Sequence, residues 1–310
     1  LSGQLHGASA AMTFDAIDAG RRALDGRLDA LSLAPHATGG WYRDLSSGGT
    51  LAQAGFDSVG IDAAGEMIGN DWRVGRHGVV GIALNRVEQS GWLSDFGDRS
   101  RGRQRELQVY AATWLGDWHA QAQLASGSFQ RQMQRNLLLG AMRDAVATRL
   151  SGDYVGASAE LGRRFDAGGI ALTPYLGTHV VQIRNDGFDE GGASGFGLRA
   201  NAWDSRRWQG FAGLRATHGW RVGDIDLRAD ARAEWQRTLA ASGAAFDASY
   251  SGLEQWAPLQ GIGLADRGNL IGTGLSASIG SRATFRFDLS RRSSPVGDNT
   301  LASLQASWRF

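Results

Sequence analysis

Histidines are the first residues to inspect for catalysis or metal binding near neutral pH, because an imidazole can transfer protons or bind a metal ion. They are scattered, with no HExxH arrangement and no paired ligand spacing. The sequence also has no Gly-x-Ser-x-Gly elbow, no P-loop and no Gly-x-Gly-x-x-Gly that opens a helix after a strand. We therefore expect no catalytic, metal-binding or cofactor-binding residues. The six histidines are His6, His36, His77, His119, His179 and His218.

The clearest group of charged residues lies between residues 225 and 236, where polar and apolar side chains alternate. The apolar set is Ile225, Leu227, Ala229, Ala231, Ala233 and Trp235, and the polar set is Asp226, Arg228, Asp230, Arg232, Glu234 and Gln236. Strict alternation predicts a β-strand with one apolar and one polar face. Because arginines separate the three acids, we interpret the polar face as a neutralised wall and not as a catalytic pair of carboxylates.

Composition excludes several classes of protein. The chain has 310 residues with 45 Gly, 4 Pro and no Cys, and its Lys+Arg count of 32 nearly equals its Asp+Glu count of 31. Because the overall charge is balanced and no basic tract stands out as one that follows nucleic-acid phosphates, we do not expect a nucleic-acid partner. The lack of cysteine fits an oxidising compartment. No apolar stretch approaches the length of a transmembrane helix. The chain begins at Leu1 without an initiator Met or signal peptide, so we expect an N-terminal part to be missing.

Residues 3–33 are predicted to form one helix, because apolar residues recur near helical spacing along the segment. Asp18 with Arg22, and Arg21 with Asp25, fall four residues apart, where side chains meet on a helix surface. The apolar face is mostly alanine, so the helix would anchor a dry core poorly and suits a polar channel. Its expected channel-facing charges are Asp18, Arg21, Arg22, Asp25 and Arg27, with Asp15 beside them.

From Gly40 onwards the sequence changes to a period of two, which predicts a succession of β-strands. We expect twelve strands, near 39–47, 51–67, 71–90, 103–116, 117–133, 148–165, 169–184, 206–221, 224–240, 268–279, 281–293 and 300–310. Tight turns are expected at Gly69-Asn70, Gly116-Asp117, Asp166-Ala167-Gly168, Val222-Gly223 and Gly280-Ser281. Longer links are expected around 91–102, 134–147, 185–205, 241–267 and 294–299.

This alternation of short and long links distinguishes two kinds of sheet. A single alternating strand fits an ordinary soluble antiparallel sheet, but an outer-membrane barrel closes its periplasmic ends with short turns and carries longer loops outside. The tryptophans Trp72, Trp118, Trp220 and Trp308 all fall near the expected periplasmic ends, as an interfacial belt requires. The sequence thus predicts an all-β membrane protein, a twelve-stranded antiparallel transmembrane β-barrel with an N-terminal α-helix plugging the lumen. Asp226, Arg228, Asp230, Arg232, Glu234 and Arg286 are its expected lumen wall.

The chain resembles the translocator, or β-domain, of classical type V autotransporters over nearly its whole length. Residues 1–28 (LSGQLHGASAAMTFDAIDAGRRALDGRL) are similar to the linker helix that precedes this barrel. The ending LASLQASWRF is similar to the outer-membrane sorting signal, in which Leu304, Ala306 and Trp308 alternate before a terminal aromatic, Phe310. The resemblance implies a linker helix over 1–38 and an outer-membrane barrel over 39–310.

The resemblance also implies the function. The domain would anchor itself in the outer membrane of a Gram-negative bacterium and bring its own N-terminal passenger to the cell surface by type V secretion. Its partners would be outer-membrane lipid, the β-barrel assembly machinery and periplasmic chaperones, and it would be a monomer without a cofactor. The first asparagine is Asn70, beyond the helix, so self-cleavage at an asparagine of the linker is not expected.

Two other functions stay open at this point. A passive small pore would lack a helix in its lumen, and an outer-membrane hydrolase barrel would need a catalytic cluster in its outer half. We expect the domain itself not to be an enzyme. The sequence of the linker helix is similar to linkers that follow subtilase-like or esterase-like passengers. The missing passenger is therefore the part expected to carry any enzymatic activity.

Overall fold

The computed structural model describes residues 3–33, 38–93, 97–139, 142–190, 195–253, 255–262, 264–280 and 283–308. Leu1, His36, Ser281 and Phe310, which figured in the sequence predictions, lie outside these residues. Neither helix in the described part of the chain is long and apolar enough to cross a membrane.

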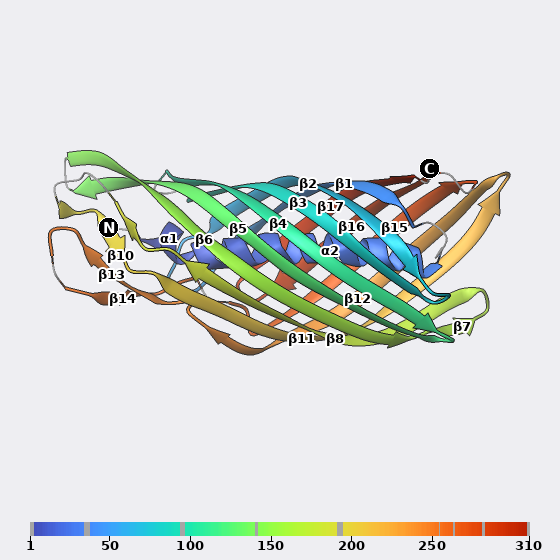
Figure 1. Cartoon of the computed structure of the whole chain (residues 1–310). Helices are drawn as coiled ribbons and strands as arrows, with labels where there is room; N and C mark the ends of the chain where they lie inside the picture. Colours follow the sequence, from blue (N-terminus) through green and yellow to red (C-terminus); the bar gives the residue numbers. More distant parts are fainter. Residues whose placement is uncertain are drawn as a thin grey trace.

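Twelve long antiparallel strands close into a barrel, as predicted (Figure 1). Each pairs with its neighbour in the sequence, and β17 pairs with β1 to complete the ring. Closure leaves no open edge, which is the condition for a sheet to lie in lipid. The strands are β1 (Gly40–Leu51), β2 (Val59–Val74), β3 (Gly78–Leu93), β4 (Asp98–Leu115), β5 (Trp118–Leu139), β6 (Met142–Arg163), β8 (Ile170–Asn185), β11 (Trp203–Val222), β12 (Ile225–Ser242), β15 (Arg267–Ile279), β16 (Ala283–Ser294) and β17 (Gly297–Trp308).

One end of the barrel, which we call the short-turn end, is closed by tight turns. Five of these turns contain a glycine in the left-handed region, with φ between 56° and 63° at Gly75, Gly116, Gly168, Gly223 and Gly280. Glycine adopts this conformation without the steric cost of a side chain. The predicted turn at Gly69-Asn70 is wrong, because both residues pair with β3 inside β2 and the chain reverses after Val74. A short strand, β7 (Phe165–Ala167), precedes the turn into β8.

At the opposite end the strands run further than the sequence indicated. Three of the predicted long links are mostly strand, since β3 reaches Leu93, β5 and β6 almost meet around residue 140, and β17 begins at Gly297. The long connections there are 186–202 and 243–266. They form a small separate sheet at this mouth, in the order β14-β13-β10-β9, built from β9 (Phe188–Asp189), β10 (Leu198–Ala200), β13 (Phe246–Tyr250) and β14 (Ala257–Leu259). We call this the small-sheet end.

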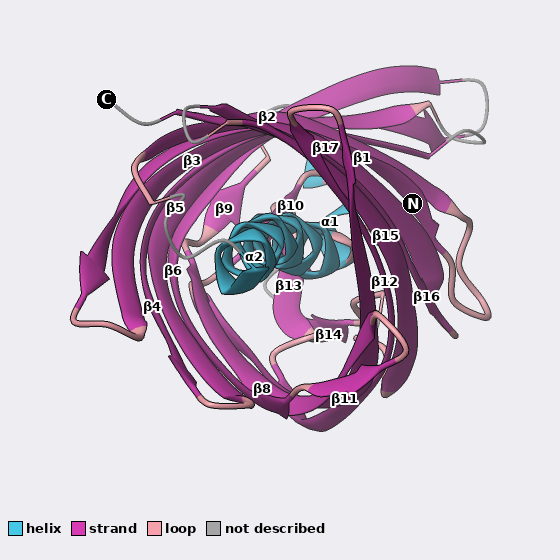
Figure 2. Cartoon of the chain, turned by 90° about the vertical axis from the view of Figure 1, so that its right-hand side faces the viewer, coloured by secondary structure: helices cyan, strands magenta, loops and turns pink. Residues whose placement is uncertain are grey.

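The N-terminal helical segment lies inside the barrel (Figure 2). It consists of α1 (Gln4–Gly7) and α2 (Ser9–Leu33), which a backbone hydrogen bond from Met12 to Ala8 nearly joins into the single helix that was predicted. The segment enters from the small-sheet end and runs towards the short-turn end, where β1 begins (Figure 1).

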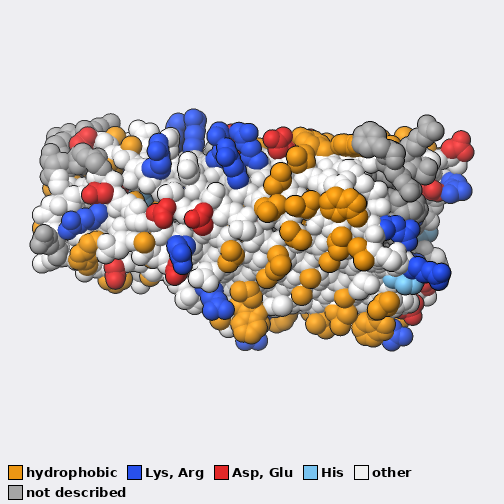
Figure 3. Space-filling view, in the orientation of Figure 1, with side chains coloured by type: hydrophobic (Ala, Val, Ile, Leu, Met, Phe, Trp, Pro, Cys, Tyr) orange, Lys and Arg blue, Asp and Glu red, His pale blue; other side chains and the backbone are white. Residues whose placement is uncertain are grey.

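The outer face of the barrel carries an apolar band. Alternate residues such as Ile82, Leu107, Leu124 and Leu176 point outwards and are exposed. The predicted belt residues Trp72, Trp118, Trp220 and Trp308 are all exposed close to the short-turn end. Figure 3 shows that hydrophobic side chains are spread over the half of this face next to the short-turn end, with charged side chains at its rim, whereas the other half carries scattered charged groups. The strands are therefore longer than the lipid-facing band.

Candidate functional site

The lumen helix is held at one point by an arginine that is almost completely buried. Arg27 donates from Nε and Nη2 to the two carboxylate oxygens of Asp71 on β2, both at 2.9 Å. Asp71 also accepts hydrogen bonds from the Tyr110 hydroxyl at 3.1 Å and from the Gly39 backbone N–H at 2.9 Å. This bidentate geometry is the strong form of an ion pair, and it fixes the last turns of α2 against the first strands.

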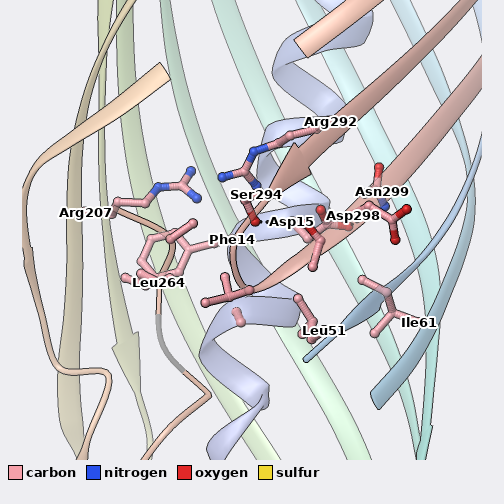
Figure 4. Close-up of a pocket in the computed structure, with 14 residues that line it drawn as sticks. Phe14, Asp15, Leu51, Ile61, Arg207, Leu264, Arg292, Ser294, Asp298 and Asn299 are labelled. Carbon is pink, nitrogen blue, oxygen red and sulfur yellow. Dashed lines mark hydrogen bonds between the residues drawn. The ribbon is translucent and has the colours of Figure 1, made fainter. Parts of the chain in front are cut away.

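A second contact lies in the middle of the helix. Asp18 accepts from Arg207 on β11 and lies 3.5 Å from Nη1 of Arg292 on β16. In Figure 4 the guanidinium groups of these two arginines point towards one another on the side of the helix that carries Phe14 and Asp15. The Arg207 guanidinium also lies 4.6 Å from the centre of the Phe14 ring. One carboxylate thus bridges two strands that are not neighbours.

Of the two charge pairs expected along the helix, one forms and the other does not. Arg21 and Asp25 form the i,i+4 ion pair at 2.7 Å, and Gln123 of β5 donates to the other oxygen of Asp25 at 2.6 Å. Arg22 does not pair with the Asp18 carboxylate. It donates instead to Asn299 on β17 at 2.9 Å and reaches only the backbone oxygen of Asp18, at 3.4 Å. The barrel wall competes successfully for this side chain because its amide lies within reach.

The six predicted wall residues are distributed unevenly. Asp230 and Arg286 form a bidentate pair, with distances of 2.7 and 3.1 Å. Glu234 accepts from the Tyr175 hydroxyl at 3.0 Å, and Arg232 lines a cavity of about 20 Å³ together with Asp29 and Asp230. Near the rim of the short-turn end, Arg228 is only partly buried.

Asp226 lies at the same rim and pairs there with Arg221 at 2.7 Å, away from the helix. The wall residues that do form ion pairs with the helix are Asp71, Arg207, Arg215 and Arg292. None of these four stood out in the sequence. Arg207 and Arg215 share the inward face of β11, and Arg292 shares that of β16 with the predicted wall residue Arg286. Alternation along these strands could indicate the direction of each side chain but not its partner on the helix.

Apolar contacts also hold the helix. Leu24, Leu28 and Leu31 are buried in one cluster with Trp41 and Met67, so this side of the lumen is drier than the alanine-rich sequence indicated. Glycines permit the close approach on other sides of the helix. A Cβ at Gly20 would lie 2.8 Å from Nδ2 of Asn85, and one at Gly26 would lie 2.8 Å from Nη1 of Arg43. The small residues of the helix therefore match the shape of the wall.

Another ionic contact of the helical segment lies at the small-sheet end. His6 of α1 lies 2.7 Å from Oε1 of Glu190 and stacks on Phe188, with ring centres 4.4 Å apart. Arg135 of β5 donates to both oxygens of the same carboxylate. Burial alone would raise the pKa of Glu190, but the hydrogen bonds from His6 and Arg135 outweigh it and lower the pKa to about 2. We call His6, Arg135 and Glu190 the mouth cluster.

The other described histidines have structural surroundings. His119 pairs with Glu160 at 3.0 Å, His179 lies 3.5 Å from Asp18, and His218 contacts the backbone oxygen of Gly169 at 3.0 Å. His77 lies in the turn between β2 and β3. Within the described residues, no group of three or more His, Asp or Glu side chains is arranged to hold a metal ion. The site is therefore a set of buried ion pairs and apolar contacts that hold a helix in the lumen.

Comparisons with known proteins agree with this geometry. No curated protein sequence matches the chain significantly. Among solved structures, the translocator domain of the autotransporter NalP from Neisseria meningitidis superposes with a TM-score of 0.74 at 18% identity, covering 96% of this chain and 98% of that one. The β-domain of the Bordetella autotransporter BrkA gives 0.63 at 17% identity, covering 88% and 99%.

The transport unit of the autotransporter AIDA-I from Escherichia coli gives a TM-score of 0.54 at 13% identity and covers 88% of this chain and 90% of that one. At sequence identities this low, the superpositions establish a shared fold and nothing more. The family is established by the sequence itself, since residues 36–290 match the family described as the autotransporter beta-domain. The barrel with its helix is thus the translocator fold, and this chain belongs to the autotransporter β-domain family.

Proposed function

We propose that this chain acts in the outer membrane of a Gram-negative bacterium, where residues 39–310 form the anchor and residues 1–38 the linker that stays in the lumen after export of a passenger. Membership of the autotransporter β-domain family supports an outer-membrane translocator for an N-terminal passenger. The observation that carries the proposal is the direction of the helix, whose N-terminal end lies at the small-sheet end (Figure 1). A passenger joined before Leu1 would emerge at that mouth.

The filled lumen supports a plug and not a passive pore. Cavities beside Asp15 and Arg22 have volumes of about 40 and 20 Å³, and one between the end of the helix and His119 has about 130 Å³. Such spaces hold a few water molecules each. His119 and His179 lie against buried carboxylates and His218 against a backbone oxygen, which supports a domain that catalyses nothing itself and leaves any enzymatic activity to the passenger.

The last strand supports a role for the C-terminus in assembly. In β17, Leu304 and Trp308 point outwards and are exposed, and Ala306 lies on the same face. The strand joins β16 to β1, so the barrel cannot close before β17 is placed. We propose that the β-barrel assembly machinery, supplied by periplasmic chaperones, reads this face together with Phe310, which lies outside the described residues, and inserts a monomer.

The test is surface display of a small folded reporter fused before Leu1. Deleting Phe310, or replacing Trp308 and Phe310 by Ser, should deplete the barrel from outer membranes and abolish protease accessibility of the reporter on intact cells. His119→Gln, His179→Gln and His218→Gln should leave display near the wild-type level. Display that survives the first changes, or a hydrolytic activity of the purified domain that disappears with the histidine changes, would contradict the translocator function in favour of a membrane enzyme.

A further inference from the structure

An arginine-rich strip covers the outer face of β3 to β6, above the apolar band. Four arginines alternate along β4 at Arg99, Arg101, Arg103 and Arg105, and all are exposed. The strip begins directly above Leu107, an exposed residue of the band on the same face of β4. Figure 3 shows basic side chains gathered beside the hydrophobic field on this face, towards the small-sheet end. The sequence has no lysine, so all of them are arginines.

The upper part of the strip is hollowed. Arg99, Arg101 and Arg149 line a groove of about 630 Å³ on the outside of β4, β5 and β6, and its other polar side chains include Gln132 and Gln134. The strand register explains the grouping, because Arg101 lies opposite Gln132 and Gln132 lies opposite Arg149. No acidic residue lines the groove. The polar groups of the groove are therefore guanidinium, amide and hydroxyl groups, and its only formal charges are positive.

The groove arginines are not neutralised by other described residues. Glu88 on β3 pairs with Arg86 at 3.3 Å and with Arg103 at 3.1 Å. Among the described parts of the chain, Arg99, Arg101 and Arg149 form no ion pair. Like charges on neighbouring strands repel, so this clustering costs stability unless anions are bound there. Arginine is suited to phosphate because its planar fork can donate two parallel hydrogen bonds.

The position of the strip determines which phosphate source it fits. It starts at the apolar band, where lipid headgroups lie, and Arg99 to Arg105 span about 20 Å of strand at roughly 3.4 Å per residue. With a strand tilt of about 40°, this is roughly 15 Å of height. A phospholipid headgroup layer is only about 5 to 8 Å deep. The strip is therefore deeper than one layer of lipid phosphates.

We propose that this strip and its groove bind an outer-leaflet glycolipid whose extended saccharide headgroup carries several phosphates. Arg86, Arg103 and Arg105 contact phosphates next to the acyl chains, and Arg99, Arg101 and Arg149 contact those further out along the saccharide. Such binding would hold the barrel at a fixed depth and neutralise the row of like charges. A single-phosphate lipid engages only the lower half of the strip.

The experiment measures binding of lipopolysaccharide with a phosphorylated core to the full chain in detergent, by native mass spectrometry or thermophoresis. The triple variant Arg99→Gln/Arg101→Gln/Arg149→Gln should bind at least about tenfold more weakly, equivalent to about 1.4 kcal/mol. A matched variant with the same charge loss elsewhere on the outer face, Arg184→Gln/Arg206→Gln/Arg237→Gln, should keep wild-type affinity. Since all six side chains are exposed, both variants should fold, which heat-modifiable gel mobility checks.

Comparison of probes identifies the ligand class. Wild type should bind the lipopolysaccharide more tightly than its dephosphorylated form, phosphatidylglycerol or inorganic phosphate, and raised salt should weaken the binding because the contacts are exposed. Equal binding by the two triple variants, or by the phosphorylated and dephosphorylated glycolipid, would overturn the proposal. Inorganic phosphate that binds as tightly as the glycolipid would assign the groove to small anions. A groove variant that keeps glycolipid affinity but loses passenger display would assign it to the passenger.

Discussion

Individual charges inside this barrel are stable because the helix and the wall supply one another's partners. Arg27 has both oxygens of Asp71, and Asp18 has Arg207 and Arg292. Taking a charge out of water costs several kcal/mol, and the opposite charge recovers that cost only when the geometry is good. Removing one member of such a pair should therefore be much worse than removing both.

Asp71→Asn should lower the free energy of unfolding of the barrel by about 3 to 5 kcal/mol, because it removes the carboxylate charge that compensates the buried guanidinium of Arg27. Urea-induced unfolding in detergent, followed by tryptophan fluorescence, would measure the change. The double variant Arg27→Met/Asp71→Leu should recover part of the loss, since no uncompensated charge remains. The exposed pair of Arg164 and Asp166 is the control, and Asp166→Asn should have little effect. Equal effects at the two aspartates would contradict a buried pair.

The mouth cluster should respond to acid. The pKa of Glu190 is lowered to about 2 in the folded chain, and an unfolded glutamate titrates near 4.3. A lowered folded pKa stabilises the protein above the unfolded value, and this stabilisation is lost as the pH falls towards the folded one. The difference in thermal stability between wild type and Glu190→Gln should thus be large at pH 7 and shrink between about pH 4 and pH 2. A difference that stays constant with pH would contradict the ion pair.

The direction in which a strand side chain points is easier to predict from the sequence than the residue that it contacts. Alternation in residues 225–236 indicated that Asp230 and Glu234 point inwards, and the structure buries both. It could not indicate that Arg286 meets Asp230, or that Asp71 meets Arg27. Those contacts depend on the rotation and depth of the helix and on the register of strands far apart in the chain. A period-two pattern indicates on which side of the barrel wall a side chain lies, but not which residue it contacts.

At the scale of elements, the helix fills the lumen by shape as well as by charge. Leu24, Leu28 and Leu31 pack on one side of the lumen, and Gly20 and Gly26 allow wall side chains to approach on others. Removing the helix should therefore open a continuous aqueous channel and expose the unpaired wall charges to it.

Deleting residues 1–34 should raise single-channel conductance in planar bilayers severalfold and lower the thermal unfolding temperature. The conductance rises because the helix occupies the central path of the lumen, and stability falls because the helix contacts are lost. The mouth-cluster variant Glu190→Gln retains the helix and serves as the control, with conductance close to that of wild type. Conductance that is unchanged after the deletion would place the helix outside the pore in the membrane.

The ends of strands were the least predictable part of the fold. Beyond the lipid both faces of a strand meet water or polar groups, so alternation disappears although the backbone pairing continues. In β5 the residues from Gln134 to Leu139 were expected to belong to a link, yet every one of them pairs with β6. Gly69 and Asn70 gave the opposite error, since a Gly-Asn pair has the composition of a turn but lies inside β2.

The two faces of β12 should tolerate charge differently. Ala231 is exposed on the outer face, and an arginine there should cost about 2 to 4 kcal/mol of barrel stability near the midplane of the bilayer. Arg228→Gln, on the inward face near the rim, should cost far less because that side chain is only partly buried. Reversible unfolding in lipid vesicles would compare the two. Equal penalties would indicate a soluble sheet.

At the scale of the whole molecule, two asymmetries agree on orientation. The short-turn end carries the tryptophan belt, and the small-sheet end carries the longer connections and the arginine strip. Outer-membrane barrels place short turns in the periplasm and longer loops outside. The N-terminal end of the helix therefore lies on the cell-surface side, which is where a passenger has to be delivered. Orientation is thus the property that connects this fold to its function.

Because the chain has no cysteine, single-cysteine labelling can test that orientation directly. Asp247→Cys, exposed in β13 of the small sheet, should react on intact cells with a maleimide that cannot cross the outer membrane. Asp224→Cys, exposed in the turn between β11 and β12, should react only after the outer membrane has been permeabilised. Both substitutions are at exposed positions of similar polarity, so folding should be equal and the barrier to the reagent should be the only difference. Labelling of Asp224→Cys on intact cells together with protection of Asp247→Cys would invert the barrel and direct the passenger to the periplasm, which would contradict export. Equal labelling of both before permeabilisation would mean that the barrel is not inserted in a membrane.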